Sequence, residues 1–299
     1  MAADAIERVI ETRAKDLGGF EVRRALPAPF RRTVGPFIFL DEMGPTTLAP
    51  NKGVDVRPHP HIGLSTVTYL FEGSLRHRDS HGVDQIIEPG DVNWMTAGSG
   101  VVHSERSPPD RSAARPLHGI QTWVAAPAEL EDEAPSFRHH PKEALPTIER
   151  DGARITLIAG EALGAASPAR GSSPIFYLFV EAEDGAVVAL PDEYEERAVY
   201  LVDGALTPLG GGEPLAAKTL GLATPGAPAS FRANGQTRAM LLGGAPVGQR
   251  HIFWNFVASS EARIEAAKRD WRAAAATGFK SGRFTLPDGE NEHIPLPDA

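Results

Sequence analysis

Residues 57–106 constrain the fold more than any other part of the chain, because short apolar stretches alternate there with glycine- and proline-bearing turns. Residues 66–71 are rich in β-branched and aromatic side chains, which favours a strand. Residues 92–96 and 101–105 form two further short strand-like stretches, and the Glu-Pro-Gly-Asp turn sequence at 88–91 precedes them. Short strands at such even spacing indicate a barrel or jelly roll rather than a parallel sheet.

Two pairs of metal-binding residue types lie at the ends of this segment. His59 and His61 are two residues apart, and so are His103 and Glu105. Side chains on a strand alternate faces with a period of two, so each pair projects from one face if its backbone is extended. A proline precedes each histidine of the first pair and favours that extended backbone. Three imidazoles and a carboxylate suit a divalent transition metal and leave positions open on a six-coordinate ion.

Several stretches of the chain resemble the pirin family of the cupin superfamily, namely PHPHIGLSTVTYLFEG, LRHRDS, PGDVNWMTAGSGVVHSER and GIQTW, with DLGGFEVRRALP and VGPFIFLDEMGP upstream. The resemblance covers nearly the whole chain. In pirins, the ligands of a single iron fall on the matching His-x-His and His-x-Glu motifs. The resemblance therefore implies that His59, His61, His103 and Glu105 bind one Fe(II) per chain, with other divalent transition metals as the alternative.

An internal repeat agrees with the two-barrel architecture that the resemblance implies. Residues 200–206 read YLVDGAL and echo residues 69–75, which read YLFEGSL. No histidine occurs between His140 and His251, so the second half cannot present a matching three-histidine site. We therefore expect one metal per chain, in the N-terminal half.

The expected fold class is all-β, with two tandem cupin domains of jelly-roll β-barrel type and a short C-terminal helix. The N-terminal metal-binding cupin domain is expected at residues 1–130 and a linker at 131–150, where the sequence is acidic, proline-bearing and irregular. The C-terminal cupin domain without a metal site, including the helix, is expected at 151–299. Residues 5–12 fit either a helix or a strand, and the resemblance favours a strand.

The C-terminal helix is predicted from its start signal and its periodicity. Ser259 or Ser260 can cap it, and a glutamate follows in its first turn. Ile264, Ala267 and Trp271 fall on one face, which makes the helix amphipathic. We expect this face to seal the second barrel.

Composition excludes several classes of function. The chain has 299 residues, no cysteine and a formal net charge of -9. The lack of cysteine rules out disulfides, thiolate metal sites and cysteine nucleophiles. The negative charge argues against direct nucleic-acid binding, and no apolar run approaches the length of a membrane span. The N-terminus lacks the apolar core of a signal peptide, so we expect a cytoplasmic protein.

The chain contains further histidines outside these two pairs. His77 either lines the mouth of the site or is structural. His118 lies just before a strand on which Gln121 and Trp123 face one way, and it either approaches the site or is structural. The adjacent histidines at 139–140 lie in the expected linker and would point to opposite sides of an extended backbone. They are therefore not expected to chelate a metal.

The resemblance implies a non-haem iron protein that cleaves flavonols, an oxidoreductase of the quercetin 2,3-dioxygenase type, with Glu105 as the catalytic base. Its partner would be a flavonol-like small molecule. The alternative is an iron-dependent redox-sensing regulator that acts through protein partners. A third reading is a cupin-type isomerase or hydrolase that uses Zn, Mn or Ni. The chain contains no P-loop, dinucleotide fingerprint or nucleophile-elbow motif that would favour another chemistry.

Overall fold

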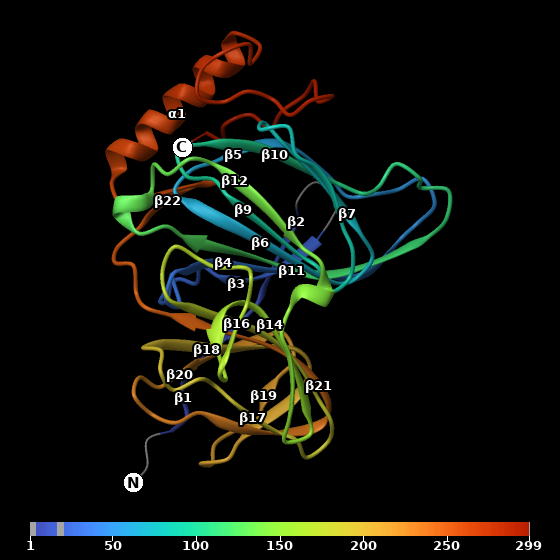
Figure 1. Ribbon diagram of the computed structural model, residues 1–299, viewed down its shortest axis with the longest axis vertical. Coiled ribbons are helices and arrows are strands. Elements are labelled where there is room, and N and C mark those ends of the chain that lie inside the picture. Colours follow the sequence, from blue (N-terminus) through green and yellow to red (C-terminus); the bar gives the residue numbers. More distant parts are fainter. Residues whose placement is uncertain (1–3, 17–20, 299) are drawn as a thin grey trace. The chain divides into compact units, whose positions relative to one another are not determined.

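The computed structural model of the protein describes residues 4–16 and 21–298, and every structural statement below refers to these residues (Figure 1). The chain forms two compact units. Unit 1 comprises Met1–Lys15, Arg23–Asp41 and His140–Pro246, and unit 2 comprises Asp16–Val22, Glu42–His139 and Val247–Ala299. No described helix is both long enough and apolar enough to cross a membrane.

Unit 2 contains a four-stranded sheet and most of a seven-stranded sheet. The smaller sheet has the order β5-β10-β7-β8, and the larger has the order β12-β9-β6-β11-β4-β3-β2. The strands are β2 (Arg13–Asp16), β3 (Glu21–Leu26), β4 (Phe37–Leu48), β5 (Asp55–His61), β6 (Leu64–Glu72), β7 (Leu75–Asp79), β8 (Asp84–Ile87), β9 (Val92–Thr96), β10 (Val101–Arg106), β11 (Arg115–Ala125) and β12 (Ser136–His140). Within β2, β3, β4 and β12, the chain passes from one unit to the other.

Unit 1 is built on a ten-stranded sheet with the order β1-β20-β18-β21-β16-β14-β13 and three short strands beside it. Its strands are β1 (Ile6–Glu11), β13 (Thr147–Arg150), β14 (Ala153–Ala162), β15 (Ala165–Ala166), β16 (Ile175–Ala182), β17 (Val187–Ala189), β18 (Glu196–Pro208), β19 (Leu215–Ala216), β20 (Thr219–Ala223) and β21 (Ser230–Gly244). Phe176, Val199 and Phe231 belong to its apolar core. The all-β fold is confirmed, and β1 confirms the strand that the resemblance favoured.

The units differ from the expected domain boundaries. The segment expected as a linker, 131–150, is not irregular, because it contains β12, which pairs with β9, and β13, which pairs with β14. It also contains the 3-10 helix Lys142–Ala144, and a second 3-10 helix, Ala128–Leu130, precedes it. Pairing between distant segments therefore divides the chain, since β1 joins unit 1 by pairing with β20.

The C-terminal segment also differs from expectation. After β22 (His251–Phe253) and β23 (Phe256–Ala258), α1 (Glu261–Ala276) begins at its N-cap Ser260. Its buried face does not seal the second barrel. Trp271 and its neighbours on that face instead pack with Ile62 and Val102 of unit 2, and Figure 1 shows the C-terminal segment (red) beside β5 and β10. Burial of this apolar face against the back of the smaller sheet joins the segment to unit 2.

One glycine fixes the chain where it leaves β5. Gly63 has a φ of +66°, and a Cβ there would lie 2.2 Å from the carbonyl oxygen of Val257. The Gly63 N–H donates to the carbonyl oxygen of Gly98, and its own carbonyl oxygen accepts from the Ala126 N–H. Because only glycine tolerates both the conformation and the contact, this position sets the path of the chain directly after His61.

Candidate metal centre

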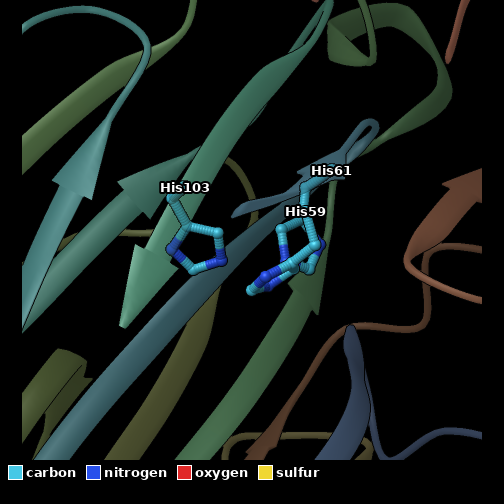
Figure 2. A group of neighbouring side chains, drawn as sticks. All are labelled: His59, His61 and His103. Carbon is cyan, nitrogen blue, oxygen red and sulfur yellow. The ribbon is translucent and has the colours of Figure 1, made fainter. Parts of the chain in front are cut away.

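Two neighbouring strands bring three histidines together. β5 and β10 pair antiparallel, with His103 opposite His59 and Val101 opposite His61. The ring centroids of His59 and His103 are 4.4 Å apart, and that of His61 is 5.1 Å from His59 and 4.9 Å from His103. One potential ligand atom from each ring lies within 4.8 Å of the others (Figure 2). The period-two spacing therefore predicted this cluster correctly.

The hydrogen bonds of these rings leave their Nε2 atoms available to a cation. His59 Nδ1 donates to the Arg57 carbonyl oxygen at 2.9 Å, and His61 Nδ1 donates to the Asn255 carbonyl oxygen at 3.1 Å. With Nδ1 protonated, each Nε2 carries a free lone pair. His103 Nε2 is buried and has no hydrogen-bond partner among the described residues. A buried polar atom of this kind requires a partner, and a metal ion fits the donor set.

Burial disfavours the protonated form of the three imidazoles. Burial, and then repulsion from His59 and other neighbouring imidazoles, lowers the pKa of His61 and of His103 well below the ordinary histidine value. Burial also lowers the pKa of His59, where the hydrogen bond to the Arg57 carbonyl oxygen and then the charge of Glu105 partly oppose the effect. A neutral imidazole is the form that binds a metal, so burial prepares the cluster for this role.

Glu105 occupies a different position from the three histidines. The β5–β10 register shifts between His103 and Glu105, which is a β-bulge or irregularity, so the period-two rule does not carry over from His103 to Glu105 on this pairing. Glu105 Oε1 accepts a hydrogen bond from Gln121 Nε2 at 2.7 Å. Among the residues that the structure describes, the compact cluster contains the three histidines alone. Ligation by Glu105 therefore stays a prediction.

The larger sheet supplies a wall of the site. Trp123 lies edge-on to His61, with ring centroids 5.0 Å apart. Gln121, two residues earlier on β11, contacts Glu105 and also lies 3.4 Å from Thr68 Oγ1. The prediction that Gln121 and Trp123 face the same way is thus confirmed, and both face the residues of the candidate site.

The structure also places the histidines whose roles the sequence left open. His77 lies against the cluster, since its Nδ1 is 3.3 Å from His103 Nδ1. His118 Nε2 is instead 2.7 Å from the buried carboxylate of Glu42. His139 Nδ1 lies 2.8 Å from Asn93 Oδ1 on β9, and so it belongs to the larger sheet of unit 2 and not to a linker.

Phe137 is a contributor that the sequence analysis missed. Its ring stacks on that of His77 with a centroid distance of 4.5 Å. The alternation of Phe137 with Arg138 and His139 is the period-two pattern of a strand, and this signal was present in the sequence. The acidic, proline-bearing sequence around Phe137 led instead to the prediction of a linker.

Double-sheet jelly rolls are the architecture of cupins, among other proteins. A sequence model described as Pirin matches residues 19–124, and one described as Pirin C-terminal cupin domain matches residues 177–277. The chain belongs to the pirin family. A pirin-like protein of Caulobacter vibrioides is 50% identical over 98% of this chain and 100% of its own length.

Other relatives carry an enzyme name. A Pseudomonas aeruginosa protein provisionally named quercetin 2,3-dioxygenase is 37% identical over 97% of this chain and 90% of its own length. A crystal structure of quercetin 2,3-dioxygenase from Acinetobacter baumannii superposes with a TM-score of 0.87 at 31% identity, covering 98% of this chain and 95% of that chain. A bacterial pirin from Escherichia coli in complex with nickel(II) shares the fold, with a TM-score of 0.63 at 18% identity, covering 80% of this chain and 99% of that chain.

Proposed function

We propose that this protein is an Fe(II)-dependent oxidoreductase of the quercetin 2,3-dioxygenase type that opens the central ring of a flavonol with O₂. The observation that carries the proposal is the cluster of three buried histidines, in which the buried Nε2 of His103 has no hydrogen-bond partner among the described residues. The names of the relatives from Pseudomonas aeruginosa and Acinetobacter baumannii support the substrate class.

In this proposal, His59, His61, His103 and Glu105 hold the metal. Iron bound there would supply open coordination positions for the hydroxy-keto edge of a flavonol and for O₂. The cluster lies among buried side chains, so water is largely excluded and charge interactions are strengthened.

Glu105 is the residue that we assign to proton transfer. Its carboxylate would accept the proton of the flavonol 3-hydroxyl group, and the hydrogen bond from Gln121 Nε2 to Oε1 would hold it in orientation. Trp123 forms an apolar face beside His61. A flat aromatic substrate can pack against such a face in an offset or edge-on arrangement.

Aerobic consumption of quercetin by Fe(II)-reconstituted protein tests the proposal. The wild type should lose the flavonol absorbance and release carbon monoxide, whereas His61→Ala should do neither and should bind less iron. His81→Ala is the matched control, because His81 is exposed in a turn and lies outside the cluster. Turnover by metal-free protein would refute the proposal. Stoichiometric iron without turnover would favour the redox-sensing alternative, in which the protein acts through protein partners.

A further inference from the structure

The three clustered histidines differ in the hydrogen-bond partner of their Nδ1 atom. His59 and His61 each donate Nδ1–H to a backbone carbonyl oxygen. Among the described residues, no backbone carbonyl contacts a ring nitrogen of His103, and its Nδ1 faces the Nδ1 of His77 at 3.3 Å. A backbone carbonyl is a fixed acceptor, whereas a second imidazole can itself be polarised by whatever it contacts. His103 is therefore the ligand whose basicity can depend on other side chains.

The unpartnered Nε2 of His103 determines the direction of the hydrogen bonds that link His103, His77 and Asp79. Its Nε2 is buried, has no partner within residues 4–16 and 21–298, and must carry the lone pair if it binds a metal. His103 Nδ1 then carries the hydrogen and donates to His77 Nδ1. A neutral His77 consequently has its own hydrogen on Nε2, which lies 3.3 Å from Asp79 Oδ2. The chain of donors thus runs from His103 through His77 to a carboxylate.

Both supporting residues are held firmly in place. They lie on β7, where Asp79 is opposite His103 and His77 is opposite Glu105 on β10. The side chains of His77 and Asp79 are only 6% and 2% exposed. The ring of Phe137 stacks on His77, with an angle of 25° between the ring planes. Such burial and stacking leave the imidazole of His77 little freedom to turn away from His103.

Backbone groups fix the carboxylate as well. Asp79 Oδ1 accepts the His81 N–H at 2.8 Å and the Val83 N–H at 3.3 Å, so only Oδ2 faces His77. In addition, the Asp79 N–H donates to the Val83 carbonyl oxygen. This turn places one carboxylate oxygen against the imidazole Nε2 of His77, which is the arrangement needed to polarise that ring.

We propose that His77 and Asp79 are positioning residues that act through His103, fixing its ring and increasing the electron donation of its Nε2 to the bound metal. The inference rests on the metal site of the proposed function. Hydrogen bonds to the second nitrogen of a metal-bound histidine raise its basicity, and their loss typically weakens metal binding by about 10–100-fold. A more basic ligand also stabilises Fe(III) over Fe(II). Loss of the hydrogen bonds from His103 through His77 to Asp79 should therefore raise the midpoint potential of bound iron.

Asp79→Asn is the sharpest test, because it changes one atom without changing the shape. Asn Oδ1 can still accept both backbone N–H groups, but its amide nitrogen would donate to His77 Nε2. His77 would then carry its hydrogen on Nδ1, facing the hydrogen of His103. His77→Gln tests the same hydrogen bonds by replacing the imidazole that links His103 to Asp79. Matched controls are Asp84→Asn on the neighbouring exposed strand and His81→Gln in the turn.

Two measurements decide the matter, namely the rate at which a chelator removes Fe(II) and the midpoint potential of the bound iron. Asp79→Asn and His77→Gln should lose iron about 10–100-fold faster than the wild type, with a midpoint potential shifted to more positive values. The controls should behave as the wild type. Faster iron loss with an unchanged potential would indicate a merely structural role and would overturn the inference, as would wild-type behaviour of both variants.

The same experiment separates this inference from the proposed site. If the wild type binds no iron that depends on His61, the proposed metal site itself fails. If His61-dependent iron is present and the potential does not respond to His77 or Asp79, only the present inference fails. Should Asp79→Asn not fold, His77→Gln still gives both readouts.

Discussion

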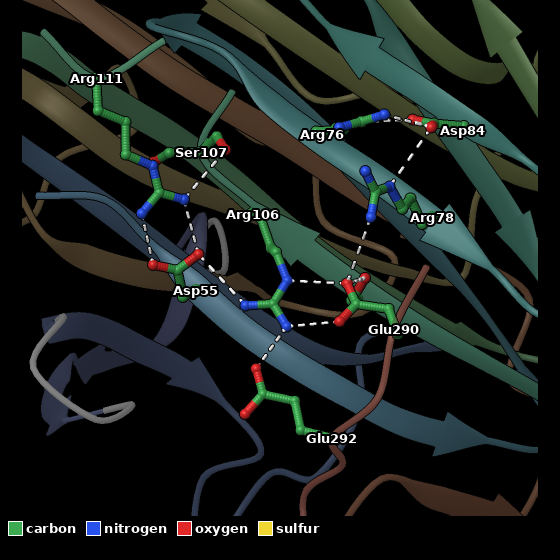
Figure 3. A network of polar contacts seen from close by, with 10 residues as sticks. Asp55, Arg76, Arg78, Asp84, Arg106, Ser107, Arg111, Glu290 and Glu292 are labelled. Carbon is green, nitrogen blue, oxygen red and sulfur yellow. Dashed lines mark hydrogen bonds and ion pairs between the residues drawn. The ribbon is translucent and has the colours of Figure 1, made fainter. Parts of the chain in front are cut away.

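Glu290, near the C-terminus, contacts the reverse face of the ligand strand β10 (Figure 3). Its Oε1 accepts hydrogen bonds of 2.8 Å from Ser104 Oγ and Arg106 Nε, and its Oε2 accepts one of 2.7 Å from Arg106 Nη2. Ser104 and Arg106 alternate along the strand with His103 and Glu105. We predict that Glu290→Gln destabilises unit 2, because the amide cannot accept at both atoms and carries no charge.

The size of the effect follows from burial. The side chain of Glu290 is 4% exposed and that of Arg106 is 21% exposed. Removing one partner of a buried ion pair costs about 3–5 kcal/mol. Arg106 is partly hydrated and keeps Asp55 and Glu292 as partners, so we expect a loss of about 2–3 kcal/mol in the free energy of unfolding. For a unit of this size, the loss lowers the Tm by about 4–12 °C.

Glu292→Gln is the matched control for calorimetry. Glu292 contacts the same Arg106 at 2.8 Å, but its side chain is 45% exposed, so its loss should cost under about 1 kcal/mol. Amide exchange of residues 288–298 and of β10 should accelerate in Glu290→Gln alone. Equal Tm shifts in the two variants, or exchange that rises uniformly over unit 2, would refute the argument that burial of Glu290 secures this segment.

Three further predictions concern the site and its surroundings. Gln121→Leu should lower kcat/KM for quercetin by about 10–100-fold in steady-state assays, because Glu105 loses the hydrogen bond that orients it. Gly63→Ala should destabilise the protein by more than about 1 kcal/mol in denaturant unfolding, since its Cβ would meet the Val257 carbonyl oxygen at a positive φ. Burial lowers the pKa of all three clustered histidines in the folded state, so the unfolded chain binds more protons, and the unfolding free energy of metal-free protein should fall as pH drops below about 6.5.

The sequence predicted the parts of the site that depend on local periodicity. The spacing of two in His-x-His and the pairing of short strands were enough to place His59, His61 and His103 together. The same rule placed Gln121 and Trp123 on one face. The register shift before Glu105 could not be predicted, because it depends on how one strand opposes another and not on either strand alone.

Contacts between distant segments were the main source of error. The helix was correctly predicted as amphipathic, but periodicity identifies an apolar face and not the surface that covers it. Trp271 therefore packs with Val102 in unit 2 although 169 residues separate them in the sequence. In the same way, Phe137 reached His77 from a segment that composition alone described as a linker.

The hydrogen-bond partners of the clustered histidines show why the C-terminal segment belongs to unit 2, which contains the candidate metal site. His59 takes its carbonyl partner from Arg57, two residues away on its own strand. His61 takes its partner from Asn255, between β22 and β23, and the Ile294 N–H also donates to the Pro58 carbonyl oxygen on the ligand strand at 2.8 Å. One histidine is thus oriented locally and another by a segment 194 residues further along the chain. A chain that ended before residue 247 would keep every predicted ligand and would still lack the group that orients His61. The ligand motif is therefore necessary for this site but does not by itself specify the geometry of the site.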